Sequence, residues 1–156
     1  MWSRNNIFLK KLFLILILLS FPTKNIYAKE YTFKWYNNAK VLDSLEFDDK
    51  SKYQITLAEG SWEDNEGNYG FLKCLGPIMV SPSGKIELEV FCNGFDHLEN
   101  KFSLKLIRKS EYDVGVGEAI YLSGSDRYKF LINKNCKYAI KYIKELTKGF
   151  YRHICK

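Results

Sequence analysis

A strictly alternating run, residues 85–92 (KIELEVFC), constrains the fold of this chain more than any other feature. Apolar side chains recur at every second position from Ile86 to Cys92, which is the period of a β-strand with one buried face. The four residues before it, 81–84 (SPSG), carry proline at the second position and glycine at the fourth, as tight turns do. The pattern therefore predicts an antiparallel hairpin whose second strand begins at Lys85.

Other segments share this alternation or its β-branched and aromatic composition, and 16% of the chain is aromatic. Strands are expected at residues 31–35, 53–62, 69–74, 77–80, 102–106, 112–122, 128–132, 136–143 and 150–155. Asn37 and Asn38 are expected to end the first strand, and residues 41–52 fit either a helical turn or a strand end. A helix over residues 139–146 is the alternative near the C-terminus. Short strands at this spacing predict an all-β, antiparallel, closed barrel of about eight strands, with a β-sandwich as the alternative.

Residues 1–28 have the layout of a secretory signal peptide. Arg4 and two lysines precede an apolar run at residues 12–21, and Ala28 offers a small residue for cleavage. The apolar run is too short to span a bilayer, although an uncleaved anchor that extends backwards over residues 7–9 is an alternative. We expect export to the periplasm or the medium, with residues 29–156 forming one domain.

The charge of the chain changes when this segment is set aside. Four of the 24 basic residues and none of the 18 acidic residues lie in residues 1–28, so the rest carries a formal net charge of only +2. The lysines that gather after residue 133 fit a solvated strand face. We therefore expect no nucleic-acid partner, and no membrane contact after cleavage.

Four cysteines lie beyond residue 28, and an oxidising compartment would pair them. Opposed residues of a hairpin have a constant sum of residue numbers. A turn centred between Pro82 and Ser83 gives a sum of 165, and the numbers of Cys74 and Cys92 add up to 166. A bulge near Pro77 would account for the difference of one residue. The remaining cysteines, Cys136 and Cys155, flank the last expected turn. We predict the disulfides Cys74–Cys92 and Cys136–Cys155, and no zinc site, because no C-x-x-C or histidine pair is present.

Few residues suggest chemistry. His97 and His153 have no neighbouring nucleophile and are expected at the surface. Asp64, Glu66 and Asn68 alternate like calcium ligands, but Leu75 stands where a bidentate acid is needed, so a polar hairpin tip is expected instead. No metal or cofactor is predicted.

The region after residue 113 carries glycines at 115, 117 and 124, and glycine within a strand indicates a bulge, a sharp turn or a close backbone approach. Gly124, Ser125, Arg127 and Tyr128, followed by Tyr138, resemble the G-T-G-[KR]-[FY] turn of the allene oxide cyclase and dirigent-type barrels. Asp126 replaces a glycine of that motif, and asparagines at 133 and 135 stand where glycines are usual. The resemblance covers about 25 residues and implies an eight-stranded barrel with a small apolar cavity. The family's catalytic residues have no counterpart that can be matched here.

Two classes of function remain open at this point. The first is a non-catalytic module that binds a small apolar ligand or a protein partner, with an interior or mouth lined by Phe33, Trp35, Tyr53 and Trp62. The second is a cyclase- or isomerase-like enzyme that uses an interior carboxylate. The candidate carboxylates for either function are Glu59, Asp113 and Glu118, which stand at strand ends or beside glycines. A barrel with a filled core would favour the protein partner.

Overall fold

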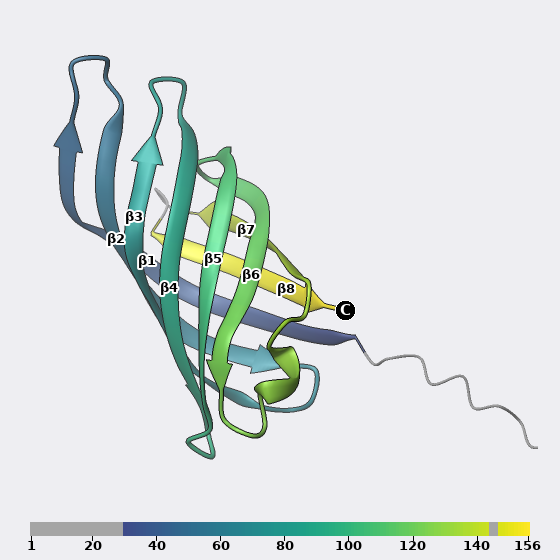
Figure 1. Ribbon diagram of the computed structural model, residues 1–156. Helices are drawn as coiled ribbons and strands as arrows, with labels where there is room; N and C mark the ends of the chain where they lie inside the picture. The colour runs from purple at the N-terminus through teal and green to yellow at the C-terminus, as the bar shows by residue number, and fades with distance from the viewer. Residues whose placement is uncertain (1–29, 144–146) are drawn as a thin grey trace, which may run out of the picture.

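The computed structural model describes residues 30–143 and 147–156. In this part of the chain, eight antiparallel strands each pair with the next, and β8 pairs with β1 to close a barrel (Figure 1). The strands are β1 (Tyr31–Glu46), β2 (Lys52–Asp64), β3 (Tyr69–Val80), β4 (Lys85–Asp96), β5 (Lys101–Glu111), β6 (Val114–Gly124), β7 (Cys136–Ile143) and β8 (Lys148–Cys155), with a 3-10 helix, η1 (Lys129–Leu131), between β6 and β7. The expectation of a closed barrel is confirmed over the sandwich. The predicted signal peptide, residues 1–28, lies outside the described residues.

Alternation along the strands divides the interior of the barrel from its outer surface. In β4 every second side chain from Ile86 to Asp96 is buried, and those between them are exposed. The same pattern continues through β5, where Phe102, Leu104, Leu106 and Arg108 are the buried residues. One face of each strand thus forms the core, as the run at residues 85–92 predicted.

Two hairpins extend beyond the other strands at one end of the barrel (Figure 1). β1 continues through Asn37 and Asn38 to Glu46, so the expectation that these asparagines end the strand is wrong. A bulge between Val41 and Asp43 shifts the β1–β2 register, and the pairing then runs on to Glu46 and Lys52. Residues 41–46 are therefore strand rather than helical turn.

Near the C-terminus, β7 and β8 form an antiparallel hairpin in which Cys136 lies opposite Cys155 and Ile143 opposite Lys148. The described part of residues 139–146 is therefore strand. Residues 144–146 lie outside the described residues.

The segment at 128–132 is not a strand. Its backbone forms η1, in which the Leu131 N–H donates to the Tyr128 carbonyl at 3.0 Å. Tyr128 and Leu131 are both buried, and their spacing of three residues is that of a helical turn rather than a strand. Both side chains join the barrel core. We call the end of the barrel that carries η1 the plugged end, and the opposite end, with the long hairpins, the mouth.

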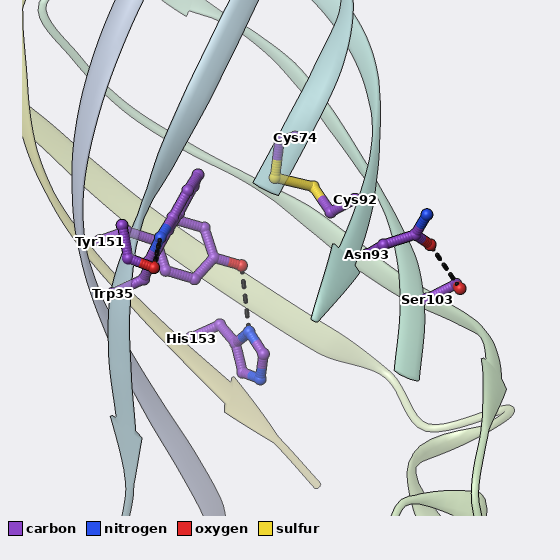
Figure 2. Close-up of a disulfide and its surroundings, with 8 residues drawn as sticks. Trp35, Cys74, Cys92, Asn93, Ser103, Tyr151 and His153 are labelled. Atoms are coloured by element: carbon purple, nitrogen blue, oxygen red, sulfur yellow. Dashed lines mark hydrogen bonds between the residues drawn. A yellow bond between two sulfur atoms is a disulfide. The ribbon is translucent and has the colours of Figure 1, made fainter. Parts of the chain in front are cut away.

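Both predicted disulfides are present, Cys74–Cys92 and Cys136–Cys155, and the described residues include no free cysteine. In each pair the two Cα atoms lie about 4 Å apart on neighbouring strands, at 4.0 Å and 4.1 Å. All four cysteines are buried. The bridges therefore link strands that already pair. Cys74–Cys92 lies in the middle of the barrel (Figure 2), and Cys136–Cys155 lies at the plugged end.

Two loops at the plugged end share one construction, an aspartate followed four residues later by an asparagine. Asp96 Oδ1 accepts the backbone N–H groups of Leu98 and Asn100 at 2.8 Å and 2.9 Å. Asp64 Oδ1 accepts those of Glu66 and Asn68, both at 2.8 Å. Asp64 thus holds this polar hairpin tip together through its hydrogen bonds to the backbone.

Asp96 also fastens η1 to this end, because the Tyr128 hydroxyl donates to Asp96 Oδ2 at 2.8 Å. Burial acts to raise the pKa of Asp96, but hydrogen bonds from Tyr128, Asn100 and Leu98 outweigh it, so the pKa lies below its ordinary value. The ionised carboxylate is therefore the form that the fold stabilises.

We expect Asp96→Asn to lower the free energy of unfolding by about 2 kcal/mol at neutral pH, because an amide NH₂ would then face groups that donate. Urea denaturation followed by tryptophan fluorescence measures the change. Asp126→Asn is the matched control, since Asp126 is exposed and its carboxylate pairs with the exposed Lys129. Equal stability of the two variants would contradict the role given to Asp96.

Candidate ligand cavity

Aromatic rings fill the half of the barrel nearest the plugged end. Phe33 stacks between Trp62 and His153, with ring centroids 4.9 Å and 4.7 Å away. Phe102 and Tyr128 pack against this stack at an angle. All five rings are buried. This half of the interior is therefore solid core.

His153 is fully buried, so the expectation of a surface histidine is wrong for this residue. Its Nε2 lies 3.1 Å from the Tyr121 hydroxyl. Its Nδ1 lies 3.0 Å from the Tyr151 hydroxyl, a contact drawn in Figure 2. Burial lowers the pKa of His153 to about 3, so the ring is neutral at physiological pH. His97, in contrast, is exposed and stacks on Tyr69.

The half of the interior towards the mouth contains a cavity of about 40 Å³. Its walls are mostly aliphatic or aromatic, and polar atoms come from Thr56, Arg108 and the hydroxyls of two tyrosines. The complete lining is Trp35, Thr56, Ala58, Cys74, Ile78, Leu88, Val90, Leu106, Arg108, Tyr138, Ile140 and Tyr142. Since a single water needs about 10–15 Å³ by this kind of measure, the space suits a group of a few heavy atoms.

The glycines of β6 allow neighbouring side chains to pack closely against this strand. A Cβ on Gly117 would lie 2.6 Å from the Tyr138 ring, and one on Gly115 would lie 2.9 Å from Arg108 Nη1. A Cβ on Gly124, at the other end of the strand, would lie 2.9 Å from the Cβ of Tyr128. The sequence had left a bulge, a sharp turn or a close backbone approach as explanations for these three glycines, and the structure shows close approach.

Arg108 is the buried cation of this cavity, with only 3% of its surface exposed. Its Nη1 and Nη2 donate to the backbone carbonyls of Glu111 and Tyr112, both at 3.3 Å. Its Nε has no hydrogen-bond partner among the described residues, and neither does the buried Oγ1 of Thr56. Two polar atoms that line one cavity are thus left unsatisfied.

A hydrogen bond spans the mouth above this site. The Tyr112 hydroxyl, from the β5–β6 turn, donates to Gln54 Oε1 of β2 at 3.1 Å. Burial raises the pKa values of Tyr138 and Tyr142, and the positive charge of Arg108 acts on both in the opposite direction. Both phenols therefore remain protonated at neutral pH.

The structure brings three of the predicted ring residues into the barrel. Phe33, Trp35 and Trp62 are buried inside it, and of these Trp35 lines the cavity. Tyr53 and Glu59 are half-buried, and alternation places them on the face of β2 opposite Thr56 and Trp62.

The other two predicted carboxylates also lie away from the interior. Asp113 is exposed in the β5–β6 turn, where its carbonyl accepts the Tyr142 N–H at 2.8 Å. Glu118 is exposed on β6 and forms an ion pair with Lys137. None of the residues that line the cavity carries a carboxylate.

Arg108 and Thr56 were missed at the level of sequence, although a signal for each is present. Alternation from Phe102 through Leu106 places Arg108 on the inward face if β5 is extended by one more pair of residues. Thr56 lies an even number of residues from Trp62 on β2, so alternation places both side chains on the inward face.

The outer surface has wider hollows, but they are open. One of about 590 Å³ lies beside the β3–β4 turn, and others of about 530 Å³ and 410 Å³ lie on the outside of the strands. The buried side-chain atoms without a partner in the described residues include none that lines these hollows. The interior cavity is therefore the better candidate site.

The described residues contain no group of three or more His, Cys, Asp or Glu side chains placed to hold a metal ion. The same part of the chain has no helix that is long and apolar enough to cross a membrane.

No protein-family model matches this sequence, and no curated protein matches it. Among solved structures, the fold is similar to that of a conserved protein of unknown function from Rhodopseudomonas palustris, with a TM-score of 0.59. The similarity covers 82% of this chain and 97% of that protein, at 12% sequence identity. The two proteins thus share a fold, and at this identity the comparison says nothing about a ligand.

Proposed function

We propose that this protein is an exported, non-catalytic binding module that takes a small ligand into the mouth half of its barrel. The main observation in support of this proposal is that side chains fill one half of the barrel interior but leave a cavity in the other half. Rings and η1 close one half, whereas the other half keeps a cavity with two unsatisfied polar atoms. Concave, mostly apolar sites with a few polar groups are typical of small-molecule binding.

Export is part of this proposal and rests on two observations. Residues 1–28 have the composition of a signal peptide, and all four cysteines are paired in disulfides. Disulfides persist in oxidising compartments, which supports a periplasmic or secreted protein. An N-terminus that begins at Lys29 in protein purified from its source would support it, and one that begins at Met1 would contradict it.

The enzyme alternative has less support. A cyclase or isomerase of the kind considered above needs an interior carboxylate, and the cavity lining contains none. Asp64 and Asp96, at the plugged end, are engaged in turn hydrogen bonds. His153 is enclosed by tyrosines and fully buried.

Native mass spectrometry of protein purified from its source tests the binding function. We expect an additional small mass on the wild-type protein that Val90→Trp, which fills the cavity, removes. Phe91→Trp is the matched control, because Phe91 is 52% exposed on the outer face of the same strand. A ligand that survives Val90→Trp in a folded variant would contradict the proposal, and so would a wild-type protein that carries no ligand and binds none of the small molecules offered to it.

A further inference from the structure

The chemistry of the cavity is set by a positive charge that the described residues do not balance. Arg108 is 3% exposed, and no carboxylate of the described chain lies within 4.0 Å of its guanidinium. Within the described part of the chain, its guanidinium donates to two backbone carbonyls, at 3.3 Å each. An unpaired buried charge is strongly destabilising, so a site of this kind gains from a bound anion.

A second polar group in the cavity, the hydroxyl of Thr56, restricts which anion can bind there. Thr56 Oγ1 is buried without a partner and lines the same cavity from β2, while Arg108 reaches it from β5. A guanidinium presents planar donors that match the two oxygens of a carboxylate, and a hydroxyl adds one more donor. The structure thus offers donors for two oxygens.

The other residues that line the cavity determine which chemical group can carry those two oxygens. Val90, Leu106 and Ile140 are apolar, and none of the lining residues besides Arg108 is charged. A phosphate, with more charge and more acceptor oxygens, would leave several oxygens against these walls. The volume of about 40 Å³ limits the attached hydrocarbon to a few atoms.

Resting on the binding function proposed above, we propose that the ligand is a short-chain monocarboxylate of about two to four carbons. Its carboxylate pairs with Arg108 and accepts from Thr56, and its hydrocarbon lies against Val90 and Leu106. Entry requires the Tyr112–Gln54 hydrogen bond across the mouth to open.

Titration of the wild-type protein, followed by NMR chemical shifts in a buffer free of carboxylates, is the first test. The probes are propionate, propionamide and inorganic phosphate. Propionate and propionamide have the same number of heavy atoms, but only propionate is charged. We expect saturable shifts with propionate and affinity at least tenfold weaker for propionamide and for phosphate.

Variants then assign the binding to the predicted groups. Arg108→Met is expected to weaken propionate binding at least tenfold, and Arg108→Lys to weaken it less. Thr56→Val, which keeps the shape of the side chain, should weaken it about three- to tenfold, as loss of one hydrogen bond does. Arg152→Met is the matched control, since Arg152 is exposed on the outside of β8, and it should bind as the wild type does.

The outcomes separate this inference from the binding function. Equal affinity for propionate and propionamide would overturn the carboxylate inference and leave the binding function standing. If neither binds while native mass spectrometry finds another carried ligand, the inference again falls alone. If neither binds and no ligand is carried, both fall. Should Arg108→Met fail to fold, the comparison of probes on the wild type still decides the question.

Discussion

Reduction of both disulfides is expected to lower the free energy of unfolding by about 6 kcal/mol, about 3 kcal/mol for each bridge. Cys74–Cys92 and Cys136–Cys155 span sequence separations of 18 and 19 residues. In the chain-entropy account, closing a loop of this length restricts the unfolded chain by about that amount. Because domains usually have about 5–15 kcal/mol in total, the reduced barrel should be close to unfolding at room temperature.

Urea denaturation of the oxidised protein, and of the reduced and alkylated protein, measures this loss. The double variants Cys74→Ala/Cys92→Ala and Cys136→Ala/Cys155→Ala separate the two bridges. Treatment of the oxidised protein with the alkylating reagent alone is the control, and should change nothing. The strand order should survive in each variant, since both bridges join strands that pair along their length. A loss below about 1 kcal/mol on full reduction would contradict the expectation.

The disulfide pairing could be predicted because hairpin register depends on local pattern. The β3–β4 partners keep one register from Gly70 and Asp96 to Val80 and Ile86, with Cys74 opposite Cys92 between them. No bulge at Pro77 shifts it, so the one-residue discrepancy in the prediction came from the turn. Its centre is Ser83 itself, inside a loop in which Ser81 N–H donates to the Lys85 carbonyl.

The plugged end could not be predicted in the same way. Tyr128, Phe130 and Ile132 alternate as strand residues do, yet the segment folds as η1. Burial of Tyr128 and Leu131 against the core, and the bond from Tyr128 to Asp96, override the local preference for a strand. Asp96 is far away in sequence, so no local pattern reveals this contact.

The cavity depends on similar non-local facts. Alternation indicates that Arg108 faces inwards, but its lack of a carboxylate partner depends on strands that come together only in the barrel. The sequence around Glu59 and Glu118 does not indicate which face of the sheet these carboxylates occupy, because the face depends on the register of their strands. The likeness of the turn at residues 124–128 to allene oxide cyclase and dirigent-type barrels remains a prediction.

Mild acid is expected to destabilise the barrel through His153. Burial holds the pKa of this ring at about 3, whereas an exposed histidine has its ordinary value of 6.5. Between these values the unfolded chain binds a proton that the folded barrel does not, so the free energy of unfolding falls as the pH falls. The slope approaches about 1.4 kcal/mol per pH unit, which gives a loss of roughly 2–3 kcal/mol between pH 6.5 and 4.5.

Urea denaturation at steps of half a pH unit between pH 6.5 and 4.5 measures the slope. This window lies above the ordinary pKa range of aspartate, so Asp96 contributes little to the slope. His153→Phe should be less stable at pH 7, because the Tyr121 and Tyr151 hydroxyls each lose a partner, but nearly all of the slope should disappear. His97→Phe, at an exposed position, should keep the wild-type slope. A slope that survives His153→Phe would contradict this expectation and show that other groups take up the protons.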